Sequence, residues 1–308
     1  MLKTHNSSIE IISEMNEKLP NIAIIGLGLI GSSIALATKQ AGAAANIVGF
    51  DNSAEVRAEA KQIGLPVTLV DDIKRAVADA DIVFLAVPVG VMAEVVRQII
   101  SHLKSGAILT DTGSTKRSVM DDINPLVTGD IFFVPGHPLA GTEFSGPSAG
   151  FPSLFKNHYW LLISENKTNR AISVMTGFCE KLGAMVEVMD ADYHDKVLAI
   201  TSHLPHLIAF TIVGTASDLE HDLKNDVIRF SASGFRDFTR IAASDPTMWR
   251  DVFLNNDEAV LEMLQRFNHD LAYVQNAIKN RQGDKLFNLF ERTGEIRRSI
   301  VDIGQATD

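Results

Sequence analysis

The chain has 308 residues, of which 46% are hydrophobic and 21% are charged. This composition is typical of a folded protein that is long enough for two domains and a large core. The formal net charge of −10 argues against a nucleic-acid partner, because proteins that bind the phosphate backbone usually carry a basic excess on at least one face.

The first twenty residues form an N-terminal extension without the features of a targeting segment. They contain acidic residues and lack the apolar core of about 7–15 residues that a secretory signal needs. No uninterrupted apolar run along the chain approaches the roughly 20 residues that span a bilayer. The single cysteine, Cys179, cannot form an internal disulfide, which fits a reducing compartment. We therefore expect a cytoplasmic protein with no membrane partner.

A glycine-rich turn follows the first predicted strand. Residues 22–25 are rich in isoleucine, and Gly26, Gly28 and Gly31 lead from them into a helical pattern. A second predicted strand ends at Asp51, about 20 residues past the last glycine. The motif G-x-G-x-x-G alone is weak evidence and also fits a tight turn without a ligand. Here the strand, the helix and the acidic residue all lie where a dinucleotide-binding βαβ unit requires them.

Each residue of this pattern has a physical role. Gly26 permits the turn, Gly28 lets the backbone approach a pyrophosphate, and Gly31 lets helix and strand pack closely. The helix N-terminus faces the phosphates with its partial positive charge. Asp51 accepts hydrogen bonds from ribose hydroxyls and repels a 2′-phosphate, which favours NAD over NADP, although Arg57 weakens this preference. The predicted cofactor contacts are Gly26, Gly28, Leu29, Ile30, Gly31, Asp51, Val87 and Pro88.

Strands and helices continue to alternate through the first half of the chain. Further strands are predicted over 80–88, 106–113 and 130–138, with an amphipathic helix after the first of them. This alternation predicts an α/β fold with a doubly wound, parallel, Rossmann-type sheet over residues 21–189. Ligands of such sheets bind at the carboxyl ends of the strands, where several loops of unusual composition converge.

After about residue 190 the pattern becomes helical, and no strand pattern interrupts it. Asp245 is a plausible N-cap, and Pro246 takes the first position of the following helix. Residues 190–308 therefore predict an all-α domain, whose many apolar positions suggest burial against a partner subunit.

Two groups of polar residues in this half are candidates for a binding site. His203 and His206 lie three residues apart and share one helix face, but no further ligands at fitting spacing suggest a metal. Arg236 and Arg240 lie four residues apart and could clamp an anionic substrate. The histidines could equally be core residues, and the arginines could belong to a solvated helix face.

Five segments, in this order and spacing, carry a resemblance to a known family: IIGLGLIGSSIALA, DTGSTK, GHPLAGTEFSGP, TSHLPHLIAF and GFRDFTRIAASDPTMWRD. The chain resembles the prephenate/arogenate (cyclohexadienyl) dehydrogenases of tyrosine biosynthesis from about residue 21 to about residue 300. The resemblance implies NAD-linked oxidative decarboxylation of prephenate to 4-hydroxyphenylpyruvate, or of L-arogenate to L-tyrosine. It also implies a homodimer formed through the helical domain.

The same resemblance implies roles for individual residues. His137 would accept the proton of the substrate's ring hydroxyl, and Ser114 would share and orient that hydrogen bond. Arg240 would hold a substrate carboxylate, and Glu143 would lie at the pocket entrance. His203, His206 and Arg236 would complete the substrate pocket. Flanking Gly136 and Pro138 would fix the position of His137, because a misplacement of about 1 Å can cost on the order of a hundredfold in rate.

Two other functions remain open from the sequence. One is a dehydrogenase of β-hydroxy acids, which would need a lysine of the helical domain as acid or base and would leave His137 without a role. The other is a catalytically silent NAD-binding sensor. The preference between prephenate and arogenate also stays open, because no motif reveals a partner for the ammonium group of arogenate.

Overall fold

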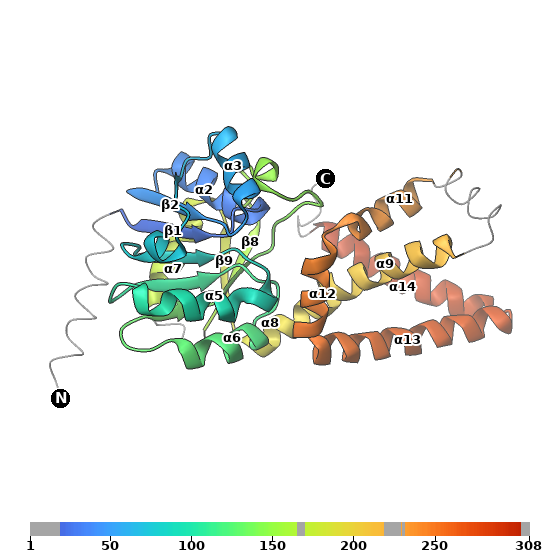
Figure 1. Ribbon diagram of the computed structural model, residues 1–308. Helices are drawn as coiled ribbons and strands as arrows, with labels where there is room; N and C mark the ends of the chain where they lie inside the picture. Colours follow the sequence, from blue (N-terminus) through green and yellow to red (C-terminus); the bar gives the residue numbers. More distant parts are fainter. Residues whose placement is uncertain (1–18, 165–169, 219–228, 230–231, 303–308) are drawn as a thin grey trace, which may run out of the picture. The chain divides into compact units, whose positions relative to one another are not determined.

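The structure is a computed structural model, shown as a ribbon in Figure 1. It describes residues 19–164, 170–218, 229 and 232–302. The chain divides into two compact units, the first ending at Asp257 and the second beginning at Glu258. The predicted domain boundary at residue 189 lies inside the first unit and stays a prediction.

A six-stranded sheet forms the centre of the first unit. Its strand order is β3-β2-β1-β4-β5-β6, and all neighbouring strands are parallel. The strands are β1 (Asn21–Ile25), β2 (Asn46–Phe50), β3 (Thr68–Leu69), β4 (Ile82–Leu85), β5 (Ile108–Asp111) and β6 (Phe132–Val134). The order reverses between β1 and β4, and ligands of such sheets bind beyond the strand ends at that point. The predicted doubly wound, Rossmann-type sheet is confirmed.

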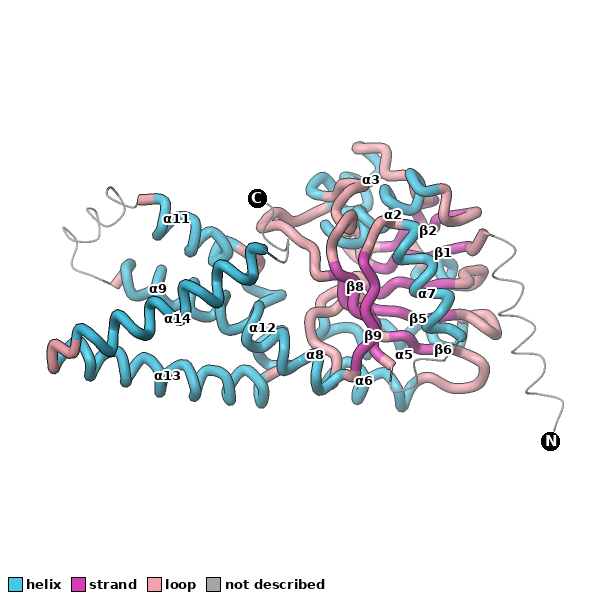
Figure 2. Tube along the Cα trace, turned by 180° about the vertical axis from the view of Figure 1, so that it is seen from behind, coloured by secondary structure: helices cyan, strands magenta, loops and turns pink. Residues whose placement is uncertain are grey.

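Alternate residues of the central strands pack on opposite faces of the sheet. Ile22 and Ile24 belong to the core that contains residues of α2, α3 and α7. Ala23 and Ile25 belong to the core that contains residues of α4, α5 and α6. The helices are α2 (Leu29–Ala41), α3 (Ala54–Gln62), α4 (Ile73–Val77), α5 (Met92–Ile99), α6 (Arg117–Ile123) and α7 (Arg170–Lys181). Burial on both faces explains why these strands read as continuous apolar runs. The helices over the two faces are visible from opposite sides in Figures 1 and 2.

A second, three-stranded sheet positions the candidate catalytic histidine. It consists of β7 (Gly136–Pro138), β8 (Tyr159–Ile163) and β9 (Met185–Met189), with β7 antiparallel and β9 parallel to β8. The sequence predicts one strand over 130–138, and this is wrong, because the chain passes from β6 to β7 at Pro135. The Pro135 carbonyl accepts a hydrogen bond from the Ile163 amide (2.9 Å), which joins the turn to the second sheet. His137 therefore lies on a strand, paired with Leu161.

Beyond residue 190 the regular elements of the described chain are helical, as predicted. They are α8 (Ala191–Leu198), the π-helical turn η5 (Ala199–His203), α9 (Leu204–Ser217), α11 (Ser233–Thr239), α12 (Pro246–Asn255), α13 (Asp257–Lys279) and α14 (Gly283–Asp302). The Asp245 carboxylate accepts a hydrogen bond from the Met248 amide (2.9 Å), so Asp245 caps α12 as expected, with Pro246 at the first position.

One continuous run of helix, Ala191–Ser217, has the length and apolar composition of a membrane span. Length and composition alone are weak evidence, because core helices of water-soluble proteins meet the same two criteria. This run also carries His194, Asp195 and His203, whose side chains are buried in hydrogen bonds with other protein groups. Its polar side chains are therefore accounted for by contacts within the protein.

Candidate functional site

The glycine-rich loop between β1 and α2 packs too closely for side chains at two positions. Gly26 has a φ of +96°, and a Cβ there would lie 2.4 Å from the carbonyl oxygen of Ala86. A Cβ at Gly31 would lie 1.9 Å from the carbonyl oxygen of Gly26. The turn itself therefore requires both glycines.

Gly28 differs from these two glycines, because no atom lies within 4 Å of the position that its Cβ would occupy. Gly28 is the N-cap of α2, and no side chain caps the helix there. The first amides of the helix, at Leu29, Ile30 and Gly31, have no intrahelical acceptor. Open space above such amides fits an anionic pyrophosphate. The loop thus has the geometry to hold the phosphates of NAD.

Asp51, at the carboxyl end of β2, fastens this loop. Its Oδ2 accepts a hydrogen bond from the Leu27 amide and its Oδ1 accepts one from the Ser53 amide, each at 2.9 Å. Each carboxylate oxygen can accept a further hydrogen bond, so the ribose hydroxyls of a dinucleotide could still bind. The guanidinium of Arg57 donates to the backbone carbonyl of Asp51 (2.5 Å) and thus lies beside the same group.

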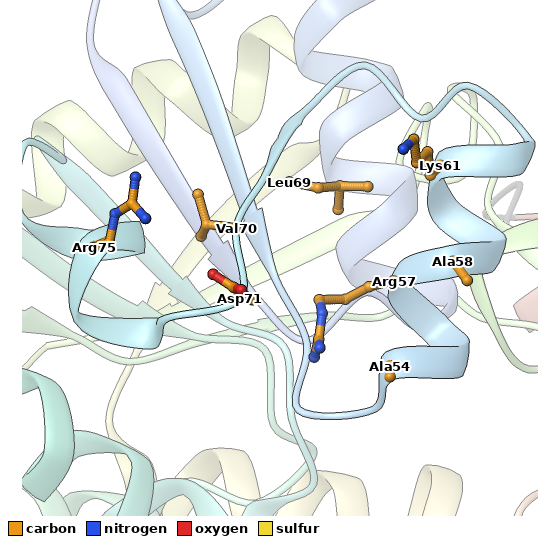
Figure 3. A pocket seen from close by; sticks show the side chains of 8 residues that line it. All are labelled: Ala54, Arg57, Ala58, Lys61, Leu69, Val70, Asp71 and Arg75. Atoms are coloured by element: carbon orange, nitrogen blue, oxygen red, sulfur yellow. The ribbon is translucent and has the colours of Figure 1, made fainter.

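A pocket with a volume of about 460 Å³ opens next to this strand end (Figure 3). It is lined by Ala54, Arg57, Ala58, Lys61, Leu69, Val70, Asp71 and Arg75. Apolar walls and nearby cations could accommodate the adenosine half of NAD. Val87 and Pro88 follow β4, and Cγ1 of Val87 lies 3.0 Å from the Cβ position of Gly26. The predicted cofactor residues therefore lie around one edge of the parallel sheet.

A chain of buried hydrogen bonds begins at His137. Nδ1 of His137 lies 2.9 Å from Nε2 of His194, and Nδ1 of His194 lies 2.7 Å from Oδ1 of Asp195. His194 is fully buried, and His137 and Asp195 are 7% and 5% exposed. The backbone amides of Lys116 and Arg117 donate to the two oxygens of Asp195, each at 2.9 Å. β7, α8 and the start of α6 thus meet at this chain.

The chain determines where the proton lies on each ring. The Asp195 carboxylate can only accept, so His194 donates from Nδ1 and keeps a lone pair on Nε2. His137 must then donate from Nδ1 to that lone pair, which leaves its own Nε2 as the basic nitrogen. Nε2 of His137 forms no hydrogen bond within the described residues, so it is available to a substrate proton.

A buried ion pair holds the strand that carries His137. The ammonium of Lys116 contacts the Asp111 carboxylate and donates to the Gly136 carbonyl (2.7 Å). Both charged side chains are fully buried. Asp111 also accepts a hydrogen bond from the Gly136 amide (3.2 Å), and a Cβ at Gly136 would lie 2.9 Å from the Asp111 carbonyl oxygen. Gly136 is therefore fixed from both sides, as its place beside His137 predicts.

His203 and His206 lie next to Trp249 of α12. The ring of His206 stacks on Trp249 with centroids 3.7 Å apart, and His206 Nδ1 donates to the Ser202 carbonyl (2.8 Å). His203 accepts at Nδ1 from the amide of Asn256 (3.0 Å), which also donates to the Asp195 carbonyl. Among the described residues, Nε2 of His203 and Nε1 of Trp249 are buried without a partner. A polar ligand could satisfy such groups.

The predicted anion clamp is only partly assembled. Arg240 donates from Nη1 to Oε2 of Glu143 (3.1 Å), across an ion pair in which Arg240 remains 60% exposed. The charge of Arg240 also acts on His206, which places the two side chains near each other. Arg236 is exposed and forms no ion pair with the described residues. Ser114 is half-buried, and within the described residues its hydroxyl does not bond to His137.

The four histidines share an electrostatic property. Burial lowers the pKa of His137 well below its ordinary value, and His194, Lys116 and His203 lower it further. Burial lowers the pKa of His203 to about 4, against an opposing effect of Asp195, and it lowers the pKa of His194 and His206 as well. All four rings are therefore neutral at pH 7, and His137 is in the form that a general base requires. Among the described residues, no group of histidine, cysteine and acidic side chains is placed to hold a metal.

Four residues of this site were missed from the sequence: Asp111, Lys116, His194 and Asp195. Lys116 belongs to the DTGSTK segment, but only its serine was interpreted. A charged residue at the end of a buried strand, such as Asp111, is a usable signal, because an unpaired buried charge is costly. His194 lies 57 residues from its partner His137, and no local pattern reveals that contact.

Comparison with known proteins follows the same division of the chain. Residues 34–188 match the nucleotide-binding domain model of prephenate dehydrogenase, and residues 190–292 match its dimerization domain model. A cyclohexadienyl dehydrogenase of Zymomonas mobilis is 42% identical over 281 residues, covering 91% of this chain and 96% of that protein. A prephenate dehydrogenase of Lactococcus lactis is 39% identical over 286 residues, covering 92% of this chain and 78% of that protein.

A solved structure agrees with these matches. Prephenate dehydrogenase from Aquifex aeolicus, crystallised with hydroxyphenyl propionate and NAD⁺, superposes with a TM-score of 0.83 at 31% identity. The match covers 91% of this chain and 98% of that one.

Proposed function

Because the chain belongs to the prephenate dehydrogenase family, we propose that its site oxidises and decarboxylates prephenate, L-arogenate or both. The protein is an NAD-dependent dehydrogenase, and the family assignment displaces the β-hydroxy acid alternative. The observation that carries the proposal is the buried chain at His137, which leaves a neutral imidazole with a basic Nε2. The products would be 4-hydroxyphenylpyruvate from prephenate and L-tyrosine from arogenate.

In this proposal His137 moves the one proton that the oxidation step must release. Nε2 accepts the proton of the hydroxyl on ring C4, while the hydrogen on C4 leaves as hydride. Bound NAD supplies the hydride acceptor. The carbonyl formed at C4 then draws electrons from the ring carboxylate, whose bond to the ring breaks to release carbon dioxide. The resulting phenolate oxygen recovers the proton from His137, which restores the neutral base.

The other predicted residues would bind and orient the substrate. Arg240, near His206, would donate to a substrate carboxylate, and the bidentate shape of its guanidinium suits that group. Glu143, which accepts from Arg240, would hold the cation at the pocket entrance until a substrate carboxylate replaces it. Ser114 would share the hydrogen bond at the C4 hydroxyl. Arg236 and His203 would line the same pocket.

Replacement of Arg240 by glutamine should raise the KM for the cyclohexadienyl substrate roughly 10- to 100-fold, because a hydrogen bond to a charged group is lost. We expect a much smaller change in kcat, since Arg240 binds the substrate before and during the reaction alike. Steady-state kinetics at saturating NAD measures both constants. Arg266→Gln is the matched control, because Arg266 forms an exposed pair with Glu262 on α13. An unchanged KM in Arg240→Gln would place the carboxylate elsewhere.

Replacement of Asp51 by alanine should shift the cofactor preference toward NADP. The carboxylate repels a 2′-phosphate, and its removal leaves Arg57 beside the ribose site. We expect the ratio of kcat/KM for NADP to that for NAD to rise at least about tenfold, from removal of roughly 1.4 kcal/mol of repulsion. Asp121→Ala, at an exposed position of α6, controls for the loss of one negative charge. A parent protein that uses both cofactors equally well would refute the role given to Asp51.

The assembly and location are proposed on separate grounds. The match to a dimerization domain supports a homodimer formed through the helical part of the chain. In α13 and α14 many large apolar side chains are exposed, which a partner subunit would cover. They are Leu261, Leu271, Tyr273, Ile278, Phe287, Phe290 and Ile296. A cytoplasmic location is supported by the single cysteine, Cys179, which is buried and unpaired.

The test is formation of reduced cofactor when the purified protein is mixed with NAD and, separately, with prephenate and with arogenate. We expect turnover of at least one substrate, and the ratio of the two kcat/KM values defines the preference. If NAD binds and neither substrate is turned over, the sensor alternative replaces this proposal.

A further inference from the structure

The contact between His137 and His194 is the start of this inference, which rests on the proposed function of His137 as the base. An imidazole can carry its proton on either ring nitrogen, and only the Nδ1–H form presents a basic Nε2. Nothing in β7 selects that form, because the printed partner of Nδ1 comes from α8. The lone pair of His194 therefore decides which nitrogen of His137 is basic.

Asp195 in turn determines which nitrogen of His194 offers the lone pair. Its Oδ1 accepts from Nδ1 of His194 at 2.7 Å. The carboxylate is itself immobilised by the amides of Lys116 and Arg117 at the start of α6. Asn256 donates to the Asp195 carbonyl and thereby ties the same residue to the end of α12. Each member of the chain is thus oriented by the next one.

The charges around the chain favour a proton on His137 during the reaction. Lys116 and Asp111 form a pair and largely neutralise each other. His203, the remaining titratable side chain that acts on His137, is neutral at pH 7 because burial lowers its pKa to about 4. The Asp195 carboxylate is therefore the unbalanced charge nearest the chain. It can stabilise an imidazolium at His137 through the intervening ring.

We propose that His194 and Asp195 are positioning residues that hold His137 in its Nδ1–H form and stabilise its protonated state through two consecutive hydrogen bonds. Neither residue touches the substrate. The arrangement follows the logic of a base oriented by a second group and stabilised by a carboxylate, with an additional imidazole inserted between them.

Two variants at His194 separate this role from simple packing. His194→Leu removes both the acceptor for His137 and the donor to Asp195. His194→Gln keeps one acceptor and one donor on a single amide group and can restore both hydrogen bonds. Asp195 is a poorer target, because it also accepts from two backbone amides at the start of α6. His102→Gln, at an exposed position, is the matched control.

The primary measurement is the tautomer of His137 in the full-length protein with ¹⁵N-labelled histidine, read from long-range ¹H–¹⁵N couplings in the NMR spectrum. The His137→Asn variant identifies the His137 signals by their loss. We expect the Nδ1–H form in the parent protein and in His102→Gln, a shift to the Nε2–H form in His194→Leu, and recovery in His194→Gln. An Nε2–H form in the parent, or an unchanged tautomer in His194→Leu, overturns the proposal.

Kinetics supply the second measurement on the same variants. We expect kcat of His194→Leu to fall by at least about 100-fold with little change in KM, since a base in the wrong tautomer is lost without loss of binding. His194→Gln should recover most of that loss. Normal kcat in His194→Leu overturns the proposal. If the parent turns over neither prephenate nor arogenate, the proposed function fails, while the NMR result still decides whether His194 sets the tautomer.

Discussion

Replacement of His137 by asparagine should lower kcat by roughly 10²- to 10⁴-fold, the usual contribution of a general base. The amide cannot accept and return a proton, so the step that releases the C4 hydroxyl proton loses its acceptor. KM should change little, because Arg240 and the surrounding pocket still bind the substrate. Steady-state kinetics with the better of the two substrates measures both constants.

The pH dependence supplies a further check on this residue. Burial holds the pKa of His137 well below 6.5, so the neutral base persists as the pH falls through that value. Activity that depends on neutral His137 should therefore be lost only at a pH below 6.5, and the low-pH limb of kcat should disappear in His137→Asn. His102→Asn controls for the substitution at an exposed histidine. A kcat unchanged in His137→Asn would remove this histidine from the mechanism.

Replacement of Lys116 by methionine should lower the free energy of unfolding by about 3–5 kcal/mol, since it leaves the Asp111 carboxylate buried without its partner. Methionine keeps much of the volume of the lysine stem, so the loss reports mainly on charge. The Gly136 carbonyl also loses its donor, and we expect the position of His137 to loosen. Urea unfolding followed by circular dichroism measures the loss of stability.

Two comparison variants define the cause of that loss. Lys104→Met breaks the partly exposed pair with Asp81 and should cost no more than about 1 kcal/mol. Adding Asp111→Asn to Lys116→Met removes the uncompensated charge and should recover part of the stability. Equal stability of the parent and Lys116→Met would contradict the role of the buried pair in holding β7.

The cofactor half of the site could be predicted from the sequence because its determinants are local. Gly26 and Gly31 are required by close contacts within a single βα turn, and Asp51 ends the next strand. The cap at Asp245 follows from residues three positions apart. Such patterns are set by neighbouring residues and the period of each element, so a sequence displays them directly.

The support of His137 could not be predicted in the same way. β7 pairs with β8, and the chain must leave one sheet and join another at Pro135. His194 and Asp195 lie in a short helix whose sequence, ADYHDK, resembles an exposed helix rich in polar residues. Both are buried only because α8 packs near α6 and β7. Contacts of this kind depend on tertiary packing, which no local pattern encodes.

The most direct test of the central claim is the mass balance of one reaction. The purified protein is mixed with NAD and prephenate, and in a second reaction with arogenate, and reduced cofactor, carbon dioxide and aromatic product are measured together. The proposed mechanism predicts that all three form in equal amounts from at least one substrate, and that none forms with His137→Asn over the same time. Absence of all three with both substrates, when NAD binding is demonstrated, would contradict it.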